Sequence, residues 1–456
     1  MIALTERTLS GWGGYQPLSC SVAEPSSRGQ LRRILDSQVE HPHVLARGLG
    51  RSYGDSAVCR GGTVLLQGNA DRILSFDRAT GLVRCEAGVT LADLIQVCLP
   101  RGWFLPTTPG TKFVTVGGAI AADVHGKNHH VDGTFGRWIR RLTLLLADGS
   151  ERVCGPDQDG DLFWATVGGM GLTGYIVEAE IQMRPCTTAY FRVDYRRHRN
   201  LDATLAAMEE TDSDYRYSVG WIDCLARGRH LGRSVLMLGN DARAEDLSAQ
   251  QADHPFTVAP KNRKSVPIYF PNMALNRLSV SLFNEVYFAA HPDRSSIVDF
   301  DTYFYPLDSI HHWNRIYGRR GFVQYQALFP PGTAEKGLRA VLETLGRFGL
   351  ASFLAVIKRS GPANPAPLSY LYPGYTLALD IPNVGERMLE MVRQLDKILL
   401  HEGGRLYLAK DSLMSEDTFR AMYPRRDEFL AVKRRVDPGN RFVSEQARRV
   451  GLIVTS

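Results

Sequence analysis

The stretch PGTKFVTVGGAIAADVHGKNHH, residues 109–130, decides how the rest of the chain is interpreted. Gly117 and Gly118 are adjacent, small alanines follow, and the stretch ends in polar residues. Backbone that carries no bulky side chains can lie directly against a flat or phosphorylated ligand. We therefore expect a ligand-contacting loop here rather than a packing helix.

Two more glycine-rich segments accompany it, ARGLGRSYGD at 46–55 and GGMGLTG at 168–174. The first follows a predicted strand at 43–46, and taken alone it is equally compatible with a tight turn that binds nothing. It lacks the GxGxxG spacing and the amphipathic helix of a dinucleotide fold. Three such segments in one region favour a large, extended, phosphate-containing cofactor.

The composition is that of a folded globular protein with more than one domain. The chain has 456 residues, of which 44% are hydrophobic and 22% charged, and this length predicts two domains. The net charge of +6 suits an anionic ligand or an acidic membrane surface, and the scattered basic residues do not point to nucleic acid.

The hydropathy and cysteine patterns indicate where the protein is located and whether its cysteines are paired. No apolar run is long enough to span a bilayer and no basic start precedes an apolar leader, so we expect a protein that is cytoplasmic or peripheral at the membrane. Seven cysteines without a CxxC pair predict reduced thiols rather than disulfides or a zinc site.

Local patterns change in character near residue 188. Before it, short strands alternate with short helices: a helix capped by Ser26 or Ser27, a hairpin around Asp148-Gly149, and a strand at 175–183. After it come longer strands and two long helices. These strands are expected at 190–195, 217–222 and 322–329, the helices at 333–348 and 384–401, and a loop at 242–264. The fold class is α+β, with an N-terminal cofactor domain and a second domain on an antiparallel sheet.

Other catalytic chemistries have weak support. His125, His129 and His130 have no acidic or cysteine partner at ligand spacing, so we expect no metal. A GxSxG motif is absent, which disfavours a serine hydrolase. Lys410 lies near Tyr407 in GRLYLAKDS, where we expect an apolar strand. It is either a surface lysine or a lysine in a cleft, where its pKa falls or its charge holds an anion.

Taken together, these segments resemble the FAD-binding domain of the vanillyl-alcohol-oxidase-like flavoproteins. Within that group the chain is most similar to the decaprenylphosphoryl-β-D-ribose 2-oxidases of actinobacteria. The similarity covers essentially the whole chain and is weakest at 185–300. Its most specific strings are DVHGKNHH, FWATVGG, WNRIYG at 313–318, GGRLYLAKDS at 403–412 and MYPRRDEFLAVKRRVDP at 422–438.

The resemblance implies a two-domain vanillyl-alcohol-oxidase-like fold, with an FAD-binding domain at 1–187 and 405–456 and a substrate-binding domain at 188–404. It implies an FAD-dependent oxidoreductase that oxidises the C2 hydroxyl of polyprenylphosphoryl-β-D-ribose to the 2-keto sugar. This is the first half of epimerisation to the arabinose donor for cell-wall arabinan. A separate NADH-dependent keto-reductase and peripheral membrane contact would complete the setting, with no role for nucleic acid.

The resemblance also implies roles for particular residues. Lys410 would act as base or sugar anchor, with His125 and Tyr53 as the other catalytic residues. Lys127, Gln326, Lys358 and Asp380 would bind the substrate. FAD would be bound by Ala46, Arg47, Gly48, Leu49, Gly50, Arg51, Ser52, Tyr53, Gly54, Asp55, Ser56, Gly110, Thr115, Val116, Gly117, Gly118, Ala122, Asp123, Val124, His125, Ile176 and Tyr407.

Three positions depart from the pattern. Arg51 stands where covalent relatives have a histidine, so we expect non-covalent FAD. Ala378 replaces the cysteine of the mycobacterial enzymes, and Arg359-Ser360 replaces an expected aromatic residue. The alternatives are an alditol or aldonolactone-type oxidase, or a biosynthetic-cluster oxidase, acting on a soluble sugar. A flavin-binding protein without turnover is disfavoured by Lys410 and His125.

Overall fold

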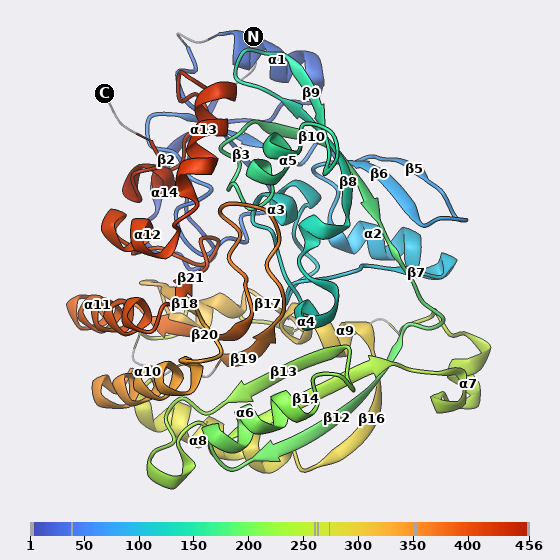
Figure 1. The fold of residues 1–456 in the computed structure, drawn as a ribbon, viewed down its shortest axis with the longest axis vertical. Helices are drawn as coiled ribbons and strands as arrows, with labels where there is room; N and C mark the ends of the chain where they lie inside the picture. The colour runs from blue at the N-terminus through green and yellow to red at the C-terminus, as the bar shows by residue number, and fades with distance from the viewer. Residues whose placement is uncertain are drawn as a thin grey trace.

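The computed structural model describes residues 4–37, 40–259, 261, 264–272, 274–350, 352 and 354–453. Helices and largely antiparallel sheets confirm the α+β class. In Figure 1 the chain forms an upper part with two smaller sheets and a lower part built on one wide sheet. No described helix is long and apolar enough to cross a bilayer.

The upper part contains a four-stranded and a five-stranded sheet. The first has the order β1 (Thr5–Leu9), β2 (Leu18–Ala23), β4 (Thr63–Leu66), β3 (Val44–Arg47), in which β2, β4 and β3 run parallel. The second is antiparallel, with the order β5 (Ile73–Phe76), β6 (Leu82–Glu86), β10 (Tyr175–Gln182), β8 (Ile139–Leu145), β9 (Glu151–Cys154). β8 and β9 form the hairpin predicted around Asp148-Gly149.

Short helices complete the upper part. α1 (Arg28–Asp36) begins at Ser27, whose side chain accepts a hydrogen bond from the Gln30 amide, and this cap is one of the two predicted. The others that precede the lower sheet are α2 (Leu91–Cys98), α3 (Val116–Ala121), α4 (His129–Asp132) and α5 (Gly160–Thr166). A small pair, β7 (Trp103–Phe104) with β11 (Arg184–Pro185), lies where the chain leaves this part.

The lower sheet has eight antiparallel strands. Their order is β16 (Arg294–Asp299), β12 (Tyr190–His198), β14 (Ser234–Asp241), β13 (Tyr217–Ile222), β19 (Ala355–Ser360), β20 (Gly374–Pro382), β18 (Phe322–Phe329), β21 (Arg405–Leu406). A separate parallel pair joins β15 (Lys264–Ser265) to β17 (Ile310–His311).

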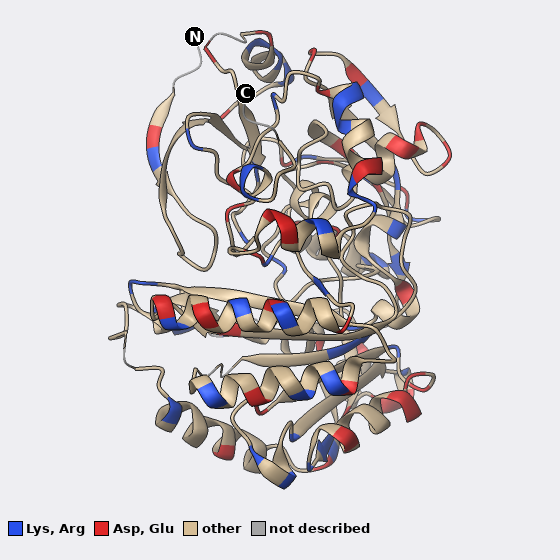
Figure 2. Cartoon of the chain, turned by 60° about the vertical axis from the view of Figure 1, so that its left-hand side comes forward, with Lys and Arg blue, Asp and Glu red and all other residues tan. Residues whose placement is uncertain are grey.

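Helices cover one face of the lower sheet. α6 (Leu201–Glu210) packs on β12 and β14, and α10 (Ala334–Phe348) packs on β18 and β20 beside α11 (Glu386–His401). Figure 2 shows blue and red bands along α10 and α11, as expected for helices whose outer faces meet water. The remaining helices of the lower part are α7 (Ala249–Asp253), α8 (Arg277–Ala290) and α9 (Phe300–Phe304).

The chain returns to the upper part after β21. α12 (Glu416–Met422), α13 (Arg426–Val436) and α14 (Glu445–Arg449) lie there, and the Val443 amide donates to the Val44 carbonyl at 3.1 Å. The domain boundaries expected at 187/188 and 404/405 stay predictions.

Strand alternation gives the lower sheet two distinct faces. The register pairs Gln324 with Asp380 and Gln326 with Ala378, and these side chains point away from α11. The residue between the two glutamines, Tyr325, faces α11 instead, where its hydroxyl donates to Asp396 at 3.0 Å. The polar face is therefore free to form the wall of a binding site.

Three local predictions were wrong. The 109–130 stretch is not all loop, because Val116–Ala121 forms α3, capped by the Thr115 side chain, which accepts from the Gly118 amide. Lys410 is not in a strand, because β21 ends at Leu406 and a turn follows. The 242–264 stretch contains the helix α7 and ends in β15, and part of it lies outside the described residues.

All seven cysteines are free, and six of them are buried. Among the described residues no group of three or more His, Cys, Asp or Glu side chains is arranged to hold a metal ion.

Candidate active site

A cavity of about 590 Å³ lies between the glycine segments of the upper part and the polar face of the lower sheet. Its upper wall comes from 46–57, 109–125 and 170–176, and its lower wall from β18, β19 and β20. This volume is within the range of pockets that hold cofactors and small ligands. The three glycine segments singled out in the sequence thus meet in one place.

Most of the predicted site residues line this cavity. They are Ala46, Gly48, Leu49, Gly50, Arg51, Ser52, Tyr53, Ser56, Gly110, Thr115, Gly117, Gly118, Ala122, Val124, His125, Ile176, Gln326, Lys358, Asp380, Tyr407 and Lys410. Their shared position is a structural finding, and the role of each stays a prediction.

Six predicted residues lie outside the cavity lining: Arg47, Gly54, Asp55, Val116, Asp123 and Lys127. Two of them have a supporting contact instead. Arg47 donates to the carbonyls of Ala57 and Ser10 at 2.9 and 2.8 Å, and Asp55 accepts two hydrogen bonds from Arg449.

The other four also have contacts outside the cavity lining. Val116 is fully buried in the core, and Asp123 accepts hydrogen bonds from Ser369 and Asn364. An added Cβ at Gly54 would lie 1.8 Å from the Asp411 carbonyl oxygen, so this glycine allows a close backbone approach. Lys127 was expected at the substrate, but its ammonium donates to the Tyr303 carbonyl and lies 3.9 Å from the centre of the Tyr303 ring.

Two lysines and an aspartate dominate the electrostatics of the cavity. Burial lowers the pKa of Lys410 to about 7; Asp380 opposes this shift and Lys358 adds to it. Burial also lowers the pKa of Lys358 to about 8, although part of its side chain is exposed to the cavity. The Lys410 ammonium lies 3.9 Å from the centre of the Tyr53 ring. An amine with such a pKa can exchange a proton near neutral pH.

Asp380 is the acidic member of this group. Burial raises its pKa to about 7, against the opposing effects of the hydrogen bond from Gln324 and the charge of Lys410. The Tyr317 hydroxyl also donates to it at 3.5 Å. Asp380 and Lys410 therefore titrate in the same range and influence each other.

His125 is held as a neutral ring. Burial lowers its pKa well below the ordinary value, and the charges of Lys358, His129 and Lys410 add to the shift. Its Nε2 lies 3.0 Å from the Gln326 amide nitrogen and accepts that hydrogen bond. The neutral ring then carries its proton on Nδ1, a buried atom with no partner among the described residues.

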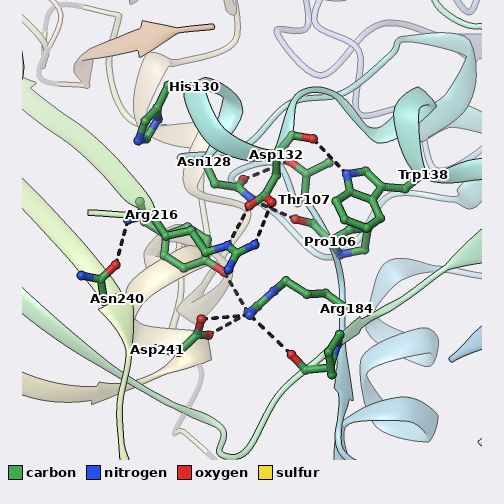
Figure 3. Close-up of polar contacts among 12 residues, drawn as sticks. Pro106, Thr107, Asn128, His130, Asp132, Trp138, Arg184, Arg216, Asn240 and Asp241 are labelled. Carbon is green, nitrogen blue, oxygen red and sulfur yellow. Dashed lines mark hydrogen bonds and ion pairs between the residues drawn. The ribbon is translucent and has the colours of Figure 1, made fainter. Parts of the chain in front are cut away.

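A second polar cluster fixes the position of helix α4, which follows His125 in the chain (Figure 3). Asp132 on α4 accepts two hydrogen bonds from Arg216, at 2.9 and 2.8 Å, and a third from Asn128 at 2.6 Å. Beside it Arg184 donates twice to Asp241, at 2.9 and 2.7 Å. We call these five residues the interlayer cluster. It ties the segment that follows His125 to the lower sheet.

Comparison with known proteins identifies the family. A family model described as an FAD binding domain matches residues 21–155, and one described as D-arabinono-1,4-lactone oxidase matches residues 379–450. The decaprenylphosphoryl-β-D-ribose oxidase of Mycolicibacterium smegmatis is 40% identical over 454 residues, which cover 98% of each chain. The chain belongs to the flavoprotein family of this oxidase.

More distant relatives share parts of this pattern. The L-gulono-1,4-lactone dehydrogenase of Mycobacterium tuberculosis is 24% identical over 97% of this chain and 98% of its own length. The human Δ24-sterol reductase is 34% identical over 134 residues, which are 29% of this chain and 26% of the reductase. The chain is thus an FAD-dependent oxidoreductase with the two-domain vanillyl-alcohol-oxidase-like fold.

The cavity of this family member fits FAD. An added Cβ at Gly110 or Gly171 would meet no atom within 4 Å, so both glycines leave room at the cavity wall that a side chain would fill. The Ser56 hydroxyl and His125 Nδ1 are buried without a partner among the described residues. Such atoms are available to hydrogen-bond a ligand.

The sequence missed several residues of the lining, among them Gln324, Leu354, Val356 and Trp313. The signal for Gln324 was present, since it precedes Gln326 by two positions on one strand and must share its face. Trp313 lies in the WNRIYG string that carried part of the resemblance. Leu354 and Val356 are ordinary apolar residues with no local mark of a site.

Proposed function

We propose that this oxidoreductase oxidises the C2 hydroxyl of a polyprenylphosphoryl-β-D-ribose to the 2-keto sugar. The observation that carries the proposal is the group formed by Lys410, Lys358 and Asp380, which all line the FAD cavity. The 40% identity to a decaprenylphosphoryl-β-D-ribose oxidase supports the same substrate class.

The residues that line the cavity have different proposed roles in this reaction. Lys410 in its neutral form accepts the hydroxyl proton at Nζ, for which a pKa near neutrality is suited. When bound, FAD supplies the two-electron acceptor for the hydride that leaves the sugar carbon. The Lys358 ammonium attracts the phosphate. Asp380 and Gln326 orient the sugar hydroxyls, and the neutral His125 offers its Nδ1 proton as a hydrogen-bond donor.

The binding of FAD is proposed to be non-covalent. Arg51 lines the cavity at the position where covalent relatives have a histidine, and a guanidinium does not form that link. The residues proposed to hold FAD are the cavity-lining members of 46–56, 110–125, Ile176 and Tyr407. We also propose the domain boundaries at 187/188 and 404/405, which the family resemblance implies.

The proposal includes a place in a reaction sequence. The 2-keto product needs a second enzyme that returns hydride to the opposite face, an NADH-dependent keto-reductase, to give the arabinose epimer used for cell-wall arabinan. The lipid tail of the substrate implies contact with a membrane surface.

A soluble-sugar oxidase is the second candidate. The match to the D-arabinono-1,4-lactone oxidase family at 379–450 includes both Asp380 and Lys410 and favours it specifically. Such an enzyme would act on an alditol or lactone without a lipid or phosphate.

An anaerobic titration distinguishes the two candidates. The visible spectrum of the FAD-loaded protein is recorded before and after addition of a short-chain prenylphosphoryl ribose, and in parallel with alditols and lactones. Bleaching of the oxidised flavin band by the phosphoryl ribose is the expected result. Bleaching by alditols or lactones alone would assign the second candidate, and no bleaching by any sugar would contradict both.

A further inference from the structure

Helix α8 (Arg277–Ala290) turns an apolar face outward. Leu278, Leu282 and Val286 are 80%, 65% and 60% exposed. Their spacing of four residues puts them on one face of the helix. α10 and α11 instead carry charged bands along their length (Figure 2). An apolar helix face in contact with water marks a binding surface rather than a packing surface.

A second apolar segment lies just before this helix. Ile268, Tyr269 and Phe270 are all exposed, with Ile268 at 68%. The segment is ordered by backbone contacts, since β15 pairs with β17 and the Phe270 amide donates to the Arg315 carbonyl at 3.0 Å. Its exposed apolar side chains therefore belong to a fixed element.

Both segments are linked to residues that line the cavity. Residues 310–313, which include β17, line the cavity and also hold the 264–270 segment. Leu275, directly before α8, packs against the cluster of Tyr53, Trp313 and Phe322, and two of these aromatic residues line the cavity as well. The apolar surface is thus connected through these contacts to the wall of the cavity.

The charges around this surface are positive. The guanidinium groups of Arg315 and Arg319 lie near Tyr269, each 5.7 Å from the centre of its ring, and Arg277 begins α8. Between 264 and 290 the sequence has a single acidic residue, Glu285, which pairs with Arg233. Apolar side chains flanked by arginines suit the interface of an anionic bilayer.

We propose that Ile268–Phe270, Leu278, Leu282 and Val286, together with Arg277, Arg315 and Arg319, form a membrane-docking surface that rests on an anionic lipid bilayer. The apolar side chains enter the headgroup region and the arginines contact lipid phosphates. The cavity mouth then faces the bilayer, so that a lipid-linked substrate enters without leaving the membrane. This last step rests on the proposed function. Two copies of the chain pairing through this surface would bring like charges together, which disfavours a dimer.

Vesicle binding tests the proposal. The FAD-loaded protein is sedimented with phosphatidylcholine vesicles that contain or lack phosphatidylglycerol. We expect binding to the anionic vesicles that weakens at high salt, and a loss of about tenfold or more in the double variant L278E/L282E. Leu400→Glu on α11, another exposed leucine, is the matched control and should bind as the wild type does.

Each other outcome overturns the proposal. These are a wild type that does not sediment with anionic vesicles, a double variant that binds like the wild type, or a control that loses binding equally. A concentration-dependent dimer in sedimentation velocity that L278E/L282E abolishes would assign the surface to a second copy.

A separate readout keeps this test apart from that of the proposed function. L278E/L282E should reduce its flavin with a water-soluble short-chain prenylphosphoryl ribose at the wild-type rate. If neither protein is reduced by that sugar but vesicle binding follows the expected pattern, the proposed function fails and the docking surface stands.

Discussion

The interlayer cluster and the cavity both contain buried charge, but they satisfy it differently. In the interlayer cluster every charged side chain meets an opposite charge in two-pronged geometry, Arg216 on Asp132 and Arg184 on Asp241. In the cavity, the part of the chain that the structure describes gives neither Lys358 nor Lys410 a carboxylate within 4.0 Å.

The pKa values of the charged groups also differ between the interlayer cluster and the cavity. The hydrogen bond from Arg216 to Asp132 raises the pKa of that guanidinium, so it stays charged at every accessible pH. Burial lowers the pKa of Lys358 to about 8 and that of Lys410 to about 7. Paired charges therefore fix the two parts of the molecule against each other, and incompletely paired charges are kept available for a ligand or a proton.

The largest effect is expected from removing the lysine with the lowered pKa. Lys410→Ala should bind FAD normally, because the flavin contacts proposed here lie mainly in the glycine segments. It should lose about 10²–10⁴-fold in the rate of sugar-dependent flavin reduction, the usual size of a lost general base. Stopped-flow absorbance of the flavin measures this rate. Lys410→Arg keeps a cation but cannot accept a proton, so a rate near that of the wild type in this variant would assign Lys410 to anchoring.

The interlayer cluster should respond in stability rather than in chemistry. Asp132→Ala leaves Arg216 without its carboxylate and removes one of the two acceptors of Asn128, and we expect the free energy of unfolding to fall by about 2–4 kcal/mol. Denaturant unfolding of the FAD-loaded protein measures it. Arg393→Ala, which breaks an exposed pair with Glu386, is the control and should cost less than about 1 kcal/mol. Equal losses in the two variants would remove the distinction between the cluster and a surface pair.

Much of this arrangement was readable from local sequence. The glycine segments, the helix at 334–348 and the hairpin at Asp148-Gly149 follow from spacing and turn chemistry alone. The gathering of Gln326, Lys358 and Asp380 on one wall was supplied by the family resemblance, since these residues lie on three different strands whose pairing local patterns do not give.

What local sequence could not give is set by tertiary contacts. Lys127 has the same chemistry as Lys410, yet the Tyr303 carbonyl, 176 positions further along the chain, determines where its ammonium lies. The alanine- and glycine-rich 116–121 segment has a weak helix signal, and the Thr115 cap together with packing against Ala87 makes it a helix. The docking surface on α8 was hidden for the same reason, because its apolar spacing equals that of a buried helix.

The smallest effect is expected from changing Asp380, whose charge affects the pKa of Lys410. Its carboxylate raises the pKa of the Lys410 ammonium, so Asp380→Asn should lower that pKa further. If neutral Lys410 is the base, the pH–rate profile of flavin reduction has a rising limb at the Lys410 pKa. The variant then moves this rising limb to lower pH by about one unit. If Lys410 instead acts as a cationic anchor, the rate falls with pH, and the falling limb moves to lower pH. The direction of the limb therefore assigns the role.

A matched aspartate on the opposite face of the sheet controls for burial alone. Asp396 on α11 is also buried, and burial raises its pKa to about 7, but it accepts from Tyr325 and faces away from the cavity. Asp396→Asn should leave the limb where it is in the wild type. A limb that moves equally in both variants, or in neither, would mean that Asp380 does not set the pKa of Lys410. The contrast between the two regions would then rest on geometry alone, without a difference in how their charges titrate.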